Sequence, residues 1–185
     1  MTTTQATQNN TVAMATGNGD STQSPRGHHI TSKVAKIAGW LERLHNSRQR
    51  GALAELRRLR SDSIPGEAFW DVVERFDIPE EEESFWLAII PLMVRHPHRR
   101  KIRPGRALEA AGISKPRFER WLRLDRHDAR AAAGRLLSKL GDDGLDWTSL
   151  EPALRYWSEK DRYDLARDFF LARQHRESSQ TDGAE

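Results

Sequence analysis

The segment FWLAIIPLMV, residues 85–94, contains no charged side chain. A helix that is apolar on every side is typical of the middle of a helical bundle, because each of its faces must be covered by a neighbouring element. Pro91 lies inside the segment and is expected to kink the helix. Pro79 and the four glutamates at residues 80–83 precede it, and the positive end of the helix dipole favours acids in a first turn. The segment therefore predicts a central helix that begins next to Pro79.

Three amphipathic helices are predicted before the central one, because apolar residues recur there three and four positions apart. Ser32 is placed to cap the first helix, and Pro65 starts the third, since the first turn of a helix tolerates proline. Asn46, Ser47 and Gly51 indicate a turn between the first two helices. The apolar positions are, in order, Val34, Ile37, Leu41 and Leu44; Leu53, Leu56 and Leu59; and Phe69, Val72, Val73 and Phe76. These positions are the expected core of the N-terminal half.

The second half of the chain is also helical in its spacing. A short helix over residues 107–111 is expected to end at Gly112, and the next helix begins at Ser114. A longer helix over residues 129–140 stops at the Gly-Asp-Asp-Gly of residues 141–144. The pairs that indicate helix starts are Asp125 with Asp128, Thr148 with Glu151, and Ser158 with Asp161. The second and third pairs are capping-box patterns, and the third is the weaker of them.

No segment alternates between apolar and polar residues with period two, so the chain is predicted to be all-α. We expect two small packed helical bundles with about eight or nine helices in total. Residues 1–30 and 176–185 have too little apolar surface to offset the entropy of ordering them, so disordered tails are expected at both ends. The N-terminal bundle is assigned to residues 31–96, and the C-terminal bundle, which carries a basic face, to residues 97–175.

Composition and motifs exclude several functional classes. The chain has no cysteine, which excludes disulfides, thiolate metal sites and thiol nucleophiles and is typical of a reducing, cytoplasmic compartment. No run approaches the ~18 apolar residues of a membrane span, and 31% of the residues are charged. The phosphate-cradle, zinc-pair and nucleophile-elbow motifs are absent. No membrane contact, no cofactor and no enzymatic activity are therefore expected.

Residues 95–130 carry most of the positive charge. They contain twelve Lys and Arg residues and four acids, a local net charge of +8, whereas the whole chain has +3. Ten of the twelve cations are arginines, whose planar guanidinium matches phosphate geometry better than an ammonium group does. Residues 98–105 are predicted to be an exposed loop, and Arg120 and Arg123 fall on the helix face opposite Phe118. This concentration of charge predicts a polyanionic partner.

Three local features have both a functional and a structural interpretation. His96 and His98 lack a third metal ligand nearby, which favours a plain surface pair. Asp142, Asp143 and Asp146 resemble a nuclease cluster, although Gly-Asp-Asp-Gly is common turn chemistry. The tryptophans, which lie on or beside apolar helical faces and so favour core packing over base stacking, are Trp40, Trp70, Trp86, Trp121, Trp147 and Trp157. We therefore expect no bound metal, and contact with the phosphate backbone that is indifferent to base sequence.

Blocks of basic residues and tryptophans occur in an order and spacing that resemble the CasB family, whose members are the small subunit of the type I-E CRISPR surveillance complex Cascade. The blocks are Trp40 with Leu44, RQRGALAELRRLR (48–60), HRRKIRPGRAL (98–108), RFERWLRLD (117–125) and DWTSLEPALRYW (146–157). The resemblance extends over residues 31–175. The polar N-terminal tail and the glutamates at residues 80–83 depart from the family's pattern.

This resemblance implies an all-helical, non-catalytic subunit of a type I-E Cascade effector complex with a role in antiviral defence. Family members lie beside the crRNA-containing subunits together with a second copy of themselves. Basic residues on one face hold the target strand and the displaced strand of the R-loop. The basic residues at matching positions are Arg50, Arg57, Arg58, Arg99, Arg103, Arg106, Arg117, Arg120 and Arg123. These nine arginines are the predicted nucleic-acid-binding site.

Two other classes of protein stay open from the residues alone. A stand-alone helical DNA-binding regulator would use residues 113–124 as a recognition helix and would prefer a palindromic site. A helical adaptor would pair its arginines with acidic protein surfaces and would ignore added DNA. Three separated arginine blocks fit a long track of phosphates better than they fit either alternative.

Overall fold

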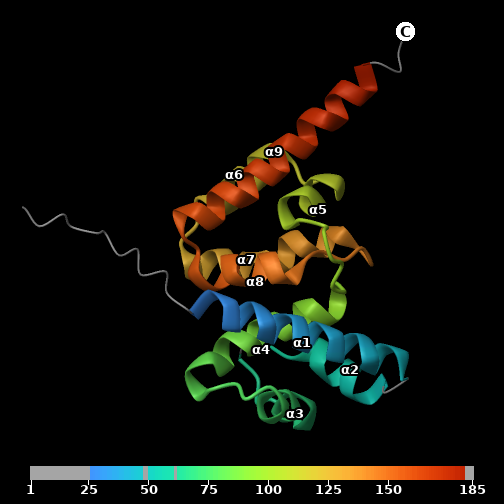
Figure 1. Cartoon of the computed structure of the whole chain (residues 1–185), viewed down its shortest axis with the longest axis vertical. Helices are drawn as coiled ribbons and strands as arrows, with labels where there is room; N and C mark the ends of the chain where they lie inside the picture. Colours follow the sequence, from blue (N-terminus) through green and yellow to red (C-terminus); the bar gives the residue numbers. More distant parts are fainter. Residues whose placement is uncertain (1–25, 48–49, 61, 182–185) are drawn as a thin grey trace, which may run out of the picture.

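The structure of the protein is a computed structural model that describes residues 26–47, 50–60 and 62–181. These residues form nine α-helices and one 3-10 helix and contain no β-strand, which confirms the predicted all-α class (Figure 1). The elements are α1 (Arg26–Asn46), α2 (Arg50–Arg58), α3 (Glu67–Arg75), α4 (Glu80–Arg95), α5 (Pro104–Ala110), α6 (Lys115–Leu122), α7 (Arg126–Leu137), η1 (Ser138–Leu140), α8 (Trp147–Tyr156) and α9 (Glu159–Thr181). None of these helices is long and apolar enough to cross a membrane.

The helices form two groups that meet along α1 and α4. Helices α1–α4 lie at the lower end of Figure 1 and α5–α9 at the upper end, and residues 96–103 connect them. Helix α1 packs along α8, and α4 contacts both α7 and α8. The buried apolar side chains form one cluster that includes residues of both groups. The division into two bundles at residues 96–97 stays a prediction.

Helix α4 is a main contributor to the core, as its sequence predicts. Pro79 is its N-cap residue, and the glutamates at residues 80–83 form its first turn, where the helix dipole stabilises negative charge. The helix continues through Pro91, which is itself buried. The other buried residues of the helix are Phe85, Trp86, Ile89, Ile90, Leu92 and Met93. They lie on more than one side of the helix because α4 contacts α1, α2, α7 and α8.

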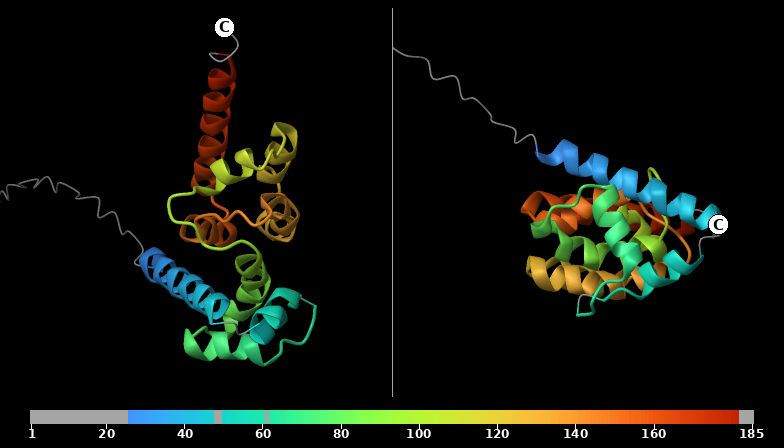
Figure 2. Two further views of the ribbon diagram at one scale, coloured as in Figure 1. Left: turned by 90° about the vertical axis from the view of Figure 1, so that its right-hand side faces the viewer. Right: turned by 90° about the horizontal axis from the view of Figure 1, so that it is seen from below.

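Both ends of the described chain extend beyond the predicted core. Helix α1 begins at Arg26, inside the segment predicted as a tail, so Ser32 lies within the helix and the prediction that it is the N-cap is wrong. Helix α9 continues to Thr181, past residue 176, where the sequence predicts a disordered tail. The C-terminal turns of α9 project beyond the other helices (Figure 2). Residues 1–25 and 182–185 of the predicted tails lie outside the described residues.

Interactions between residues one turn apart explain the extra length of α9. Arg173 Nε donates to Glu177 Oε1 at 2.8 Å, and Ser178 Oγ donates to the carbonyl oxygen of Gln174 at 3.0 Å. Pairs of residues four positions apart stabilise a helix even where its composition is polar. An argument from composition alone does not include these pairs, so it places the end of the helix too early.

The stronger of the two capping-box patterns is wrong. Helix α8 has Asp146 as its N-cap residue, and the Asp146 side chain accepts from the Thr148 backbone N–H at 3.0 Å. Glu151 is fully buried and bonds to Arg155 instead of reaching back to Thr148. Tertiary burial of the glutamate therefore decides which residue caps the helix.

Two other predicted caps are confirmed. Ser158 and Asp161 bond reciprocally, since the Ser158 N–H donates to Asp161 Oδ2 at 2.9 Å and the Asp161 N–H donates to Ser158 Oγ at 3.2 Å. At the start of α7, Asp125 Oδ1 accepts from the Asp128 N–H at 2.9 Å. These exposed caps depend only on neighbouring residues, which is why the sequence predicts them correctly.

Helix α5 packs closely against α9. Pro104 and Gly105 are buried residues of its first turn, so the predicted exposed loop, residues 98–105, is wrong for these two positions. A Cβ atom at Gly105 would collide with backbone atoms of Leu165 and Phe169. The missing side chain of Gly105 therefore permits the short distance between the two helices.

A buried group of charges joins α4 to α8. The Arg155 side chain is 11% exposed, its Nε donates to Glu151 Oε1 at 2.6 Å, and its Nη1 lies 3.4 Å from Glu82 Oε2. The same guanidinium lies over the Phe85 ring at 4.0 Å, a cation–π contact. Burial raises the pKa of Glu151 to about 7, although Arg155 acts in the opposite direction. The cost of desolvating the carboxylate is thus larger than the stabilisation that the arginine gives it.

We expect the contribution of Glu151 to stability to decrease as the pH rises from 4.5, its usual pKa, to about 7. Over this range the folded carboxyl keeps a proton that the unfolded chain releases, so the free energy of unfolding falls. Each unit of pKa difference is worth about 1.4 kcal/mol, so the full change is on the order of 3 kcal/mol. Glu151→Gln keeps an oxygen acceptor for Arg155 and does not titrate.

Urea unfolding followed by circular dichroism across this pH window measures the effect in both proteins. The difference between the wild type and Glu151→Gln isolates this one group from the other carboxylates. The same pH dependence in both proteins would contradict a raised pKa for Glu151.

Candidate nucleic-acid interface

The nine arginines of the predicted nucleic-acid-binding site are all exposed. They form three blocks, namely Arg50, Arg57 and Arg58 on α2; Arg99, Arg103 and Arg106 on the connection to α5 and on α5; and Arg117, Arg120 and Arg123 on α6 and its C-cap. Helix α2 packs against α1, α3 and α4, whereas α5 packs against α8 and α9. The first block therefore belongs to the lower group of helices in Figure 1 and the third to the upper group.

Helix α6 is held by its aromatic face, which leaves its arginines on the outside. Phe118 is fully buried and stacks on Phe169 of α9 with the ring centroids 4.0 Å apart. Trp121 is also buried, and its Nε1 donates to the carbonyl oxygen of Ala129 at 2.9 Å. The exposed side of the same helix carries the three arginines of the third block, as the helical period predicts.

Arg103 and Arg117 also make contacts within the protein. Arg103 Nη1 bonds to Asp168 Oδ1 at 3.0 Å, and the arginine side chain is 65% exposed. Arg117 Nη2 donates to the carbonyl oxygen of Arg135 at 3.0 Å. The Asp168 side chain is only 15% exposed, so Arg103 extends into solvent while its carboxylate partner is largely buried.

The connection that carries Arg99 is fixed by the segment before α8. The Arg99 N–H donates to the Leu145 carbonyl at 2.9 Å, and the Asp146 N–H donates to the Ile102 carbonyl at 2.8 Å. A Cβ atom at Gly144 would lie 2.6 Å from Arg99 Cγ, so glycine allows the two segments to approach. The exposed arginine is thus carried on a backbone of defined position, which lowers the entropy lost when a ligand binds.

His96 and His98 are structural residues, and the interpretation as a surface pair is wrong. His96 is buried, and its carbonyl oxygen accepts from Trp147 Nε1 at 2.7 Å. His98 Nδ1 accepts from the Trp147 N–H at 3.2 Å. Burial lowers the pKa of His96, which favours the neutral imidazole. In the part of the chain that the structure describes, no three His, Cys, Asp or Glu side chains are placed to hold a metal ion.

Five of the six tryptophans are buried, which confirms the core interpretation for them. Trp70 differs, because 46% of its surface is exposed. It lies on α3, at the lower edge of the molecule in Figure 1, with its ring edge-on to Phe69. Because α3 lies at the edge of the fold, no described helix covers its outer side. The spacing of apolar residues in the sequence does not show that this side stays uncovered.

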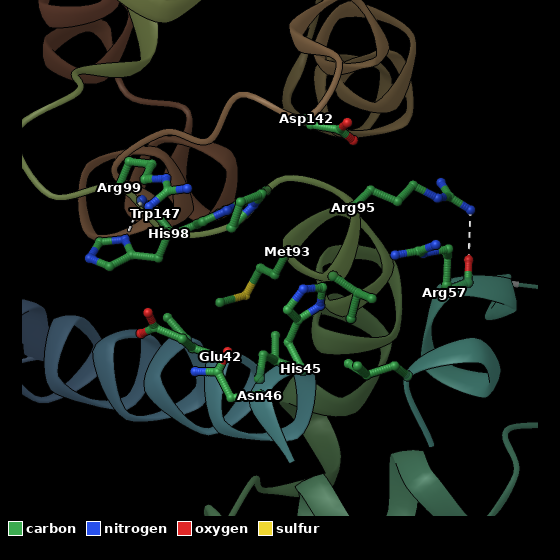
Figure 3. A pocket seen from close by; sticks show the side chains of 15 residues that line it. Glu42, His45, Asn46, Arg57, Met93, Arg95, His98, Arg99, Asp142 and Trp147 are labelled. Carbon is green, nitrogen blue, oxygen red and sulfur yellow. Dashed lines mark hydrogen bonds between the residues drawn. The ribbon is translucent and has the colours of Figure 1, made fainter. Parts of the chain in front are cut away.

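A cleft of about 590 Å³ opens between α1, the ends of α2 and α4, and the loops that carry residues 97–99 and 142 (Figure 3). Arg57 of the first block and Arg99 of the second block both line it. Two predicted blocks therefore meet at this cleft. Arg95 and His45 also line it, and the sequence does not single them out as site residues. No sequence signal joins these side chains, because they come from separate helices.

Comparison with protein families identifies the chain. The family described as CRISPR-associated protein Cse2 matches residues 52–170, which is more than half of the sequence. The chain belongs to the Cse2 family. This result confirms the resemblance to the CasB family of type I-E Cascade. A search of curated proteins finds no match.

The Cse2 match extends from α2 into α9. It includes eight of the nine predicted arginines, and only Arg50 lies before its first residue. It also includes Arg95, whereas His45 of α1 lies outside it. The region shared with the Cse2 family therefore contains the second and third arginine blocks and most of the wall of the cleft.

Proposed function

We propose that this Cse2 family protein is the non-catalytic small subunit of a type I-E Cascade effector complex and binds the backbone of nucleic acids without sequence preference. In this role it stabilises the target strand and the displaced strand of the R-loop. One observation carries the proposal: the buried aromatic face of α6 fixes the helix to the core, and three arginines occupy its exposed side.

The chemistry of this surface favours phosphate over bases. Guanidinium groups bind phosphate through paired, charge-assisted hydrogen bonds. Stacking on bases requires exposed aromatic rings, and both aromatic residues of α6, Phe118 and Trp121, are buried. The α6 surface therefore supplies charge without a stacking platform, and charge does not distinguish one base from another.

The acidic part of the chain supports the proposed protein partners, which are the crRNA-containing Cascade subunits and a second copy of the chain. Residues 62–83 contain nine acids and one arginine. They form α3 and the start of α4 in the lower group of helices, whereas α6 lies in the upper group (Figure 1). Such a surface repels nucleic acid and attracts cationic protein surfaces. Proteins that hold RNA carry cationic surfaces, so they are suitable partners for this end.

The fourfold variant Arg103→Ala, Arg106→Ala, Arg117→Ala and Arg120→Ala is expected to bind single strands less tightly and with a weaker dependence on salt. Each phosphate contact on a single strand contributes about −0.7 to the slope of log affinity against log salt, so the slope should flatten by roughly three units. The loss should be nearly equal for unrelated base sequences. Binding to several strands across a salt series measures it, with circular dichroism as the folding control.

A matched control removes the same charge elsewhere. Its four substitutions are Lys36→Ala, Arg43→Ala, Arg75→Ala and Lys160→Ala, all at exposed positions. This control is expected to change the slope much less, because its cations do not belong to the arginines that are proposed to bind phosphates. Equal slopes for the two variants would show that the nucleic-acid interface lies elsewhere on the protein. A loss confined to one base sequence would favour a DNA-binding regulator.

The protein alone is expected not to cleave nucleic acids. The acids that most resemble a nuclease site are Asp142, Asp143 and Asp146, and Asp146 is bonded as the N-cap of α8. Incubation of single-stranded, duplex and R-loop substrates with magnesium or manganese tests this expectation. Cleavage that copurifies with the protein and disappears in Asp142→Ala or Asp143→Ala would contradict the non-catalytic role.

A further inference from the structure

Arginines from two helices and a loop bring positive charge to one cleft. Figure 3 shows Arg57 and Arg95 on one side of the cleft, His98 and Arg99 on the other, and His45 between them. Two acids, at residues 42 and 142, line its margins. Arginines therefore outnumber carboxylates at this cleft.

The contact between α4 and α2 holds two arginines in the same place. Arg95 Nη2 donates to the backbone carbonyl of Arg57 at 2.7 Å, next to the C-terminus of α2. Figure 3 shows the Arg57 side chain extending from this point into the cleft. Two guanidinium groups kept near each other repel. An anion bound between them removes that repulsion and forms charge-assisted hydrogen bonds with both.

The rest of the cleft does not suit a bare anion. Leu53 and Val94 line it and are half-buried, and Pro97 lines it and is exposed. Asn46 and Glu42, one turn apart on α1, add an amide and a carboxylate to the margin. The volume of about 590 Å³ lies within the range typical of sites for small organic ligands. A ligand that fits joins an anionic group to a flat, mostly apolar group with polar edges.

We propose, on the basis of the function proposed above, that this cleft binds one nucleotide of the nucleic-acid strand. Its phosphate lies between Arg57 and Arg95, the next phosphate of the strand lies against Arg99 on the other side of the cleft, and its base lies against Leu53 and Val94. The polar edge of the base faces Asn46 and Glu42. The protein therefore contacts a base at this one position, whereas the arginines of the proposed interface otherwise contact only phosphates.

The position of Arg99 supports a strand over a free nucleotide as the source of this ligand. Arg99 lines the cleft and also belongs to the connection that leads to Arg103 at the start of α5. Backbone hydrogen bonds to Leu145 and Asp146 fix that connection. A strand whose nucleotide occupies the cleft therefore continues directly onto the second arginine block.

Binding of intact and abasic single strands to the full chain tests the proposal. Abasic nucleotides at the central positions of the strand keep every phosphate and remove only the bases. The wild type is expected to bind the abasic strand about fivefold more weakly, because the accessible apolar wall is small. Leu53→Ala removes part of the apolar wall on the base side of the cleft, so the difference in affinity between the intact and abasic strands should become smaller than in the wild type.

Arg95→Ala tests the phosphate side at an exposed position and does not depend on the folding of a core variant. It is expected to lower the affinity for the intact strand about tenfold, the loss of one charge-assisted hydrogen bond. Arg43→Ala is the matched control, because Arg43 is exposed on α1 and does not line the cleft. Thymidine monophosphate is added as a competitor and is expected not to displace the strand.

Equal binding of intact and abasic strands by the wild type would overturn the proposal, as would equal effects of Arg95→Ala and Arg43→Ala. Displacement of the strand by thymidine monophosphate would assign the cleft to a free nucleotide instead. Failure of the cleft is distinguishable from failure of the proposed function. One outcome is that the fourfold variant shows the expected flatter salt slope while the cleft variants behave like their controls. In that case the interface with the nucleic-acid backbone is supported and only the nucleotide site is wrong.

Discussion

At pH 8, where Glu151 is ionised in the folded protein, replacement of Arg155 by alanine is expected to lower the free energy of unfolding by about 3–5 kcal/mol. The guanidinium is 11% exposed and is the cation between Glu151 and Glu82. Without it, two carboxyl groups face each other at the contact between α4 and α8, and the Phe85 ring loses one of its two cation–π contacts, keeping the one to Arg130. A buried charge that loses its partner costs more than the pair contributes, because its desolvation is no longer compensated.

Urea unfolding, followed by tryptophan fluorescence and circular dichroism, measures this loss. Arg155→Lys keeps the charge but loses the planar group that contacts both carboxylates and the aromatic rings, so we expect an intermediate loss. Lys160→Ala is the matched control, since the Lys160–Asp164 pair is also four residues apart but is exposed. Its effect on the free energy of unfolding should be small, because solvent screens the exposed pair. A similarly small effect of Arg155→Ala would show that the buried charges do not hold α4 and α8 together.

Phe118→Ala is expected to lower the free energy of unfolding by about 3–5 kcal/mol, the usual cost of removing a buried phenylalanine side chain. Phe118 is fully buried and stacked on Phe169, and its ring also lies edge-on to Phe170 at 6.2 Å. The cavity left by alanine would lie between α6 and α9. The arginines of α6 would then lose the support that keeps them on one exposed face.

The same unfolding assay applies to Phe118→Ala, with Tyr163→Ala as its control, because Tyr163 is an aromatic residue of α9 that is 67% exposed. Affinity for single strands is measured under conditions in which the variant stays folded. We expect weaker binding although the net charge is unchanged. Such a result would show that binding depends on where the arginines lie and not only on how many there are. A loss below about 1 kcal/mol would contradict the close packing of α6 on α9.

The sequence predicts the exposed arginines of α6 well, and the reason is local. Phe118 and Trp121 determine which side of the helix is buried, and a period of 3.6 residues then places Arg120 and Arg123 on the other side. The central position of α4 is predictable on similar grounds, because a helix that is apolar on every side requires neighbours on every side. Both predictions use information contained within one turn or one helix.

The features that the sequence does not reveal depend on residues far apart in the chain. Glu151 resembles half of a capping box until α4 places Glu82 and Phe85 beside Arg155. His96 resembles a surface residue until Trp147 of α8 covers it. These misses have one physical cause, since burial changes the preferred partner of a polar group and burial is a property of the whole fold.

The cleft is missed for the same reason. Its arginines come from α2, α4 and the connection to α5, and no spacing in the sequence relates Arg57 to Arg95 or to His45 of α1. The sequence identifies Arg57 and Arg99 only as members of separate basic blocks. Their shared position follows from the packing of α2 against α4 and from the hydrogen bonds between the connection and Leu145.

The packing of α1 along α8 has a consequence for how the chain folds during synthesis. Helix α1 leaves the ribosome early and α8 is nearly the last helix to follow, so apolar surface of α1 stays uncovered until translation is almost complete. Contacts between such distant parts of a chain also slow folding, because a long loop must close before they form. We therefore expect the N-terminal half to be more prone to aggregation before α8 is synthesised than the complete chain is.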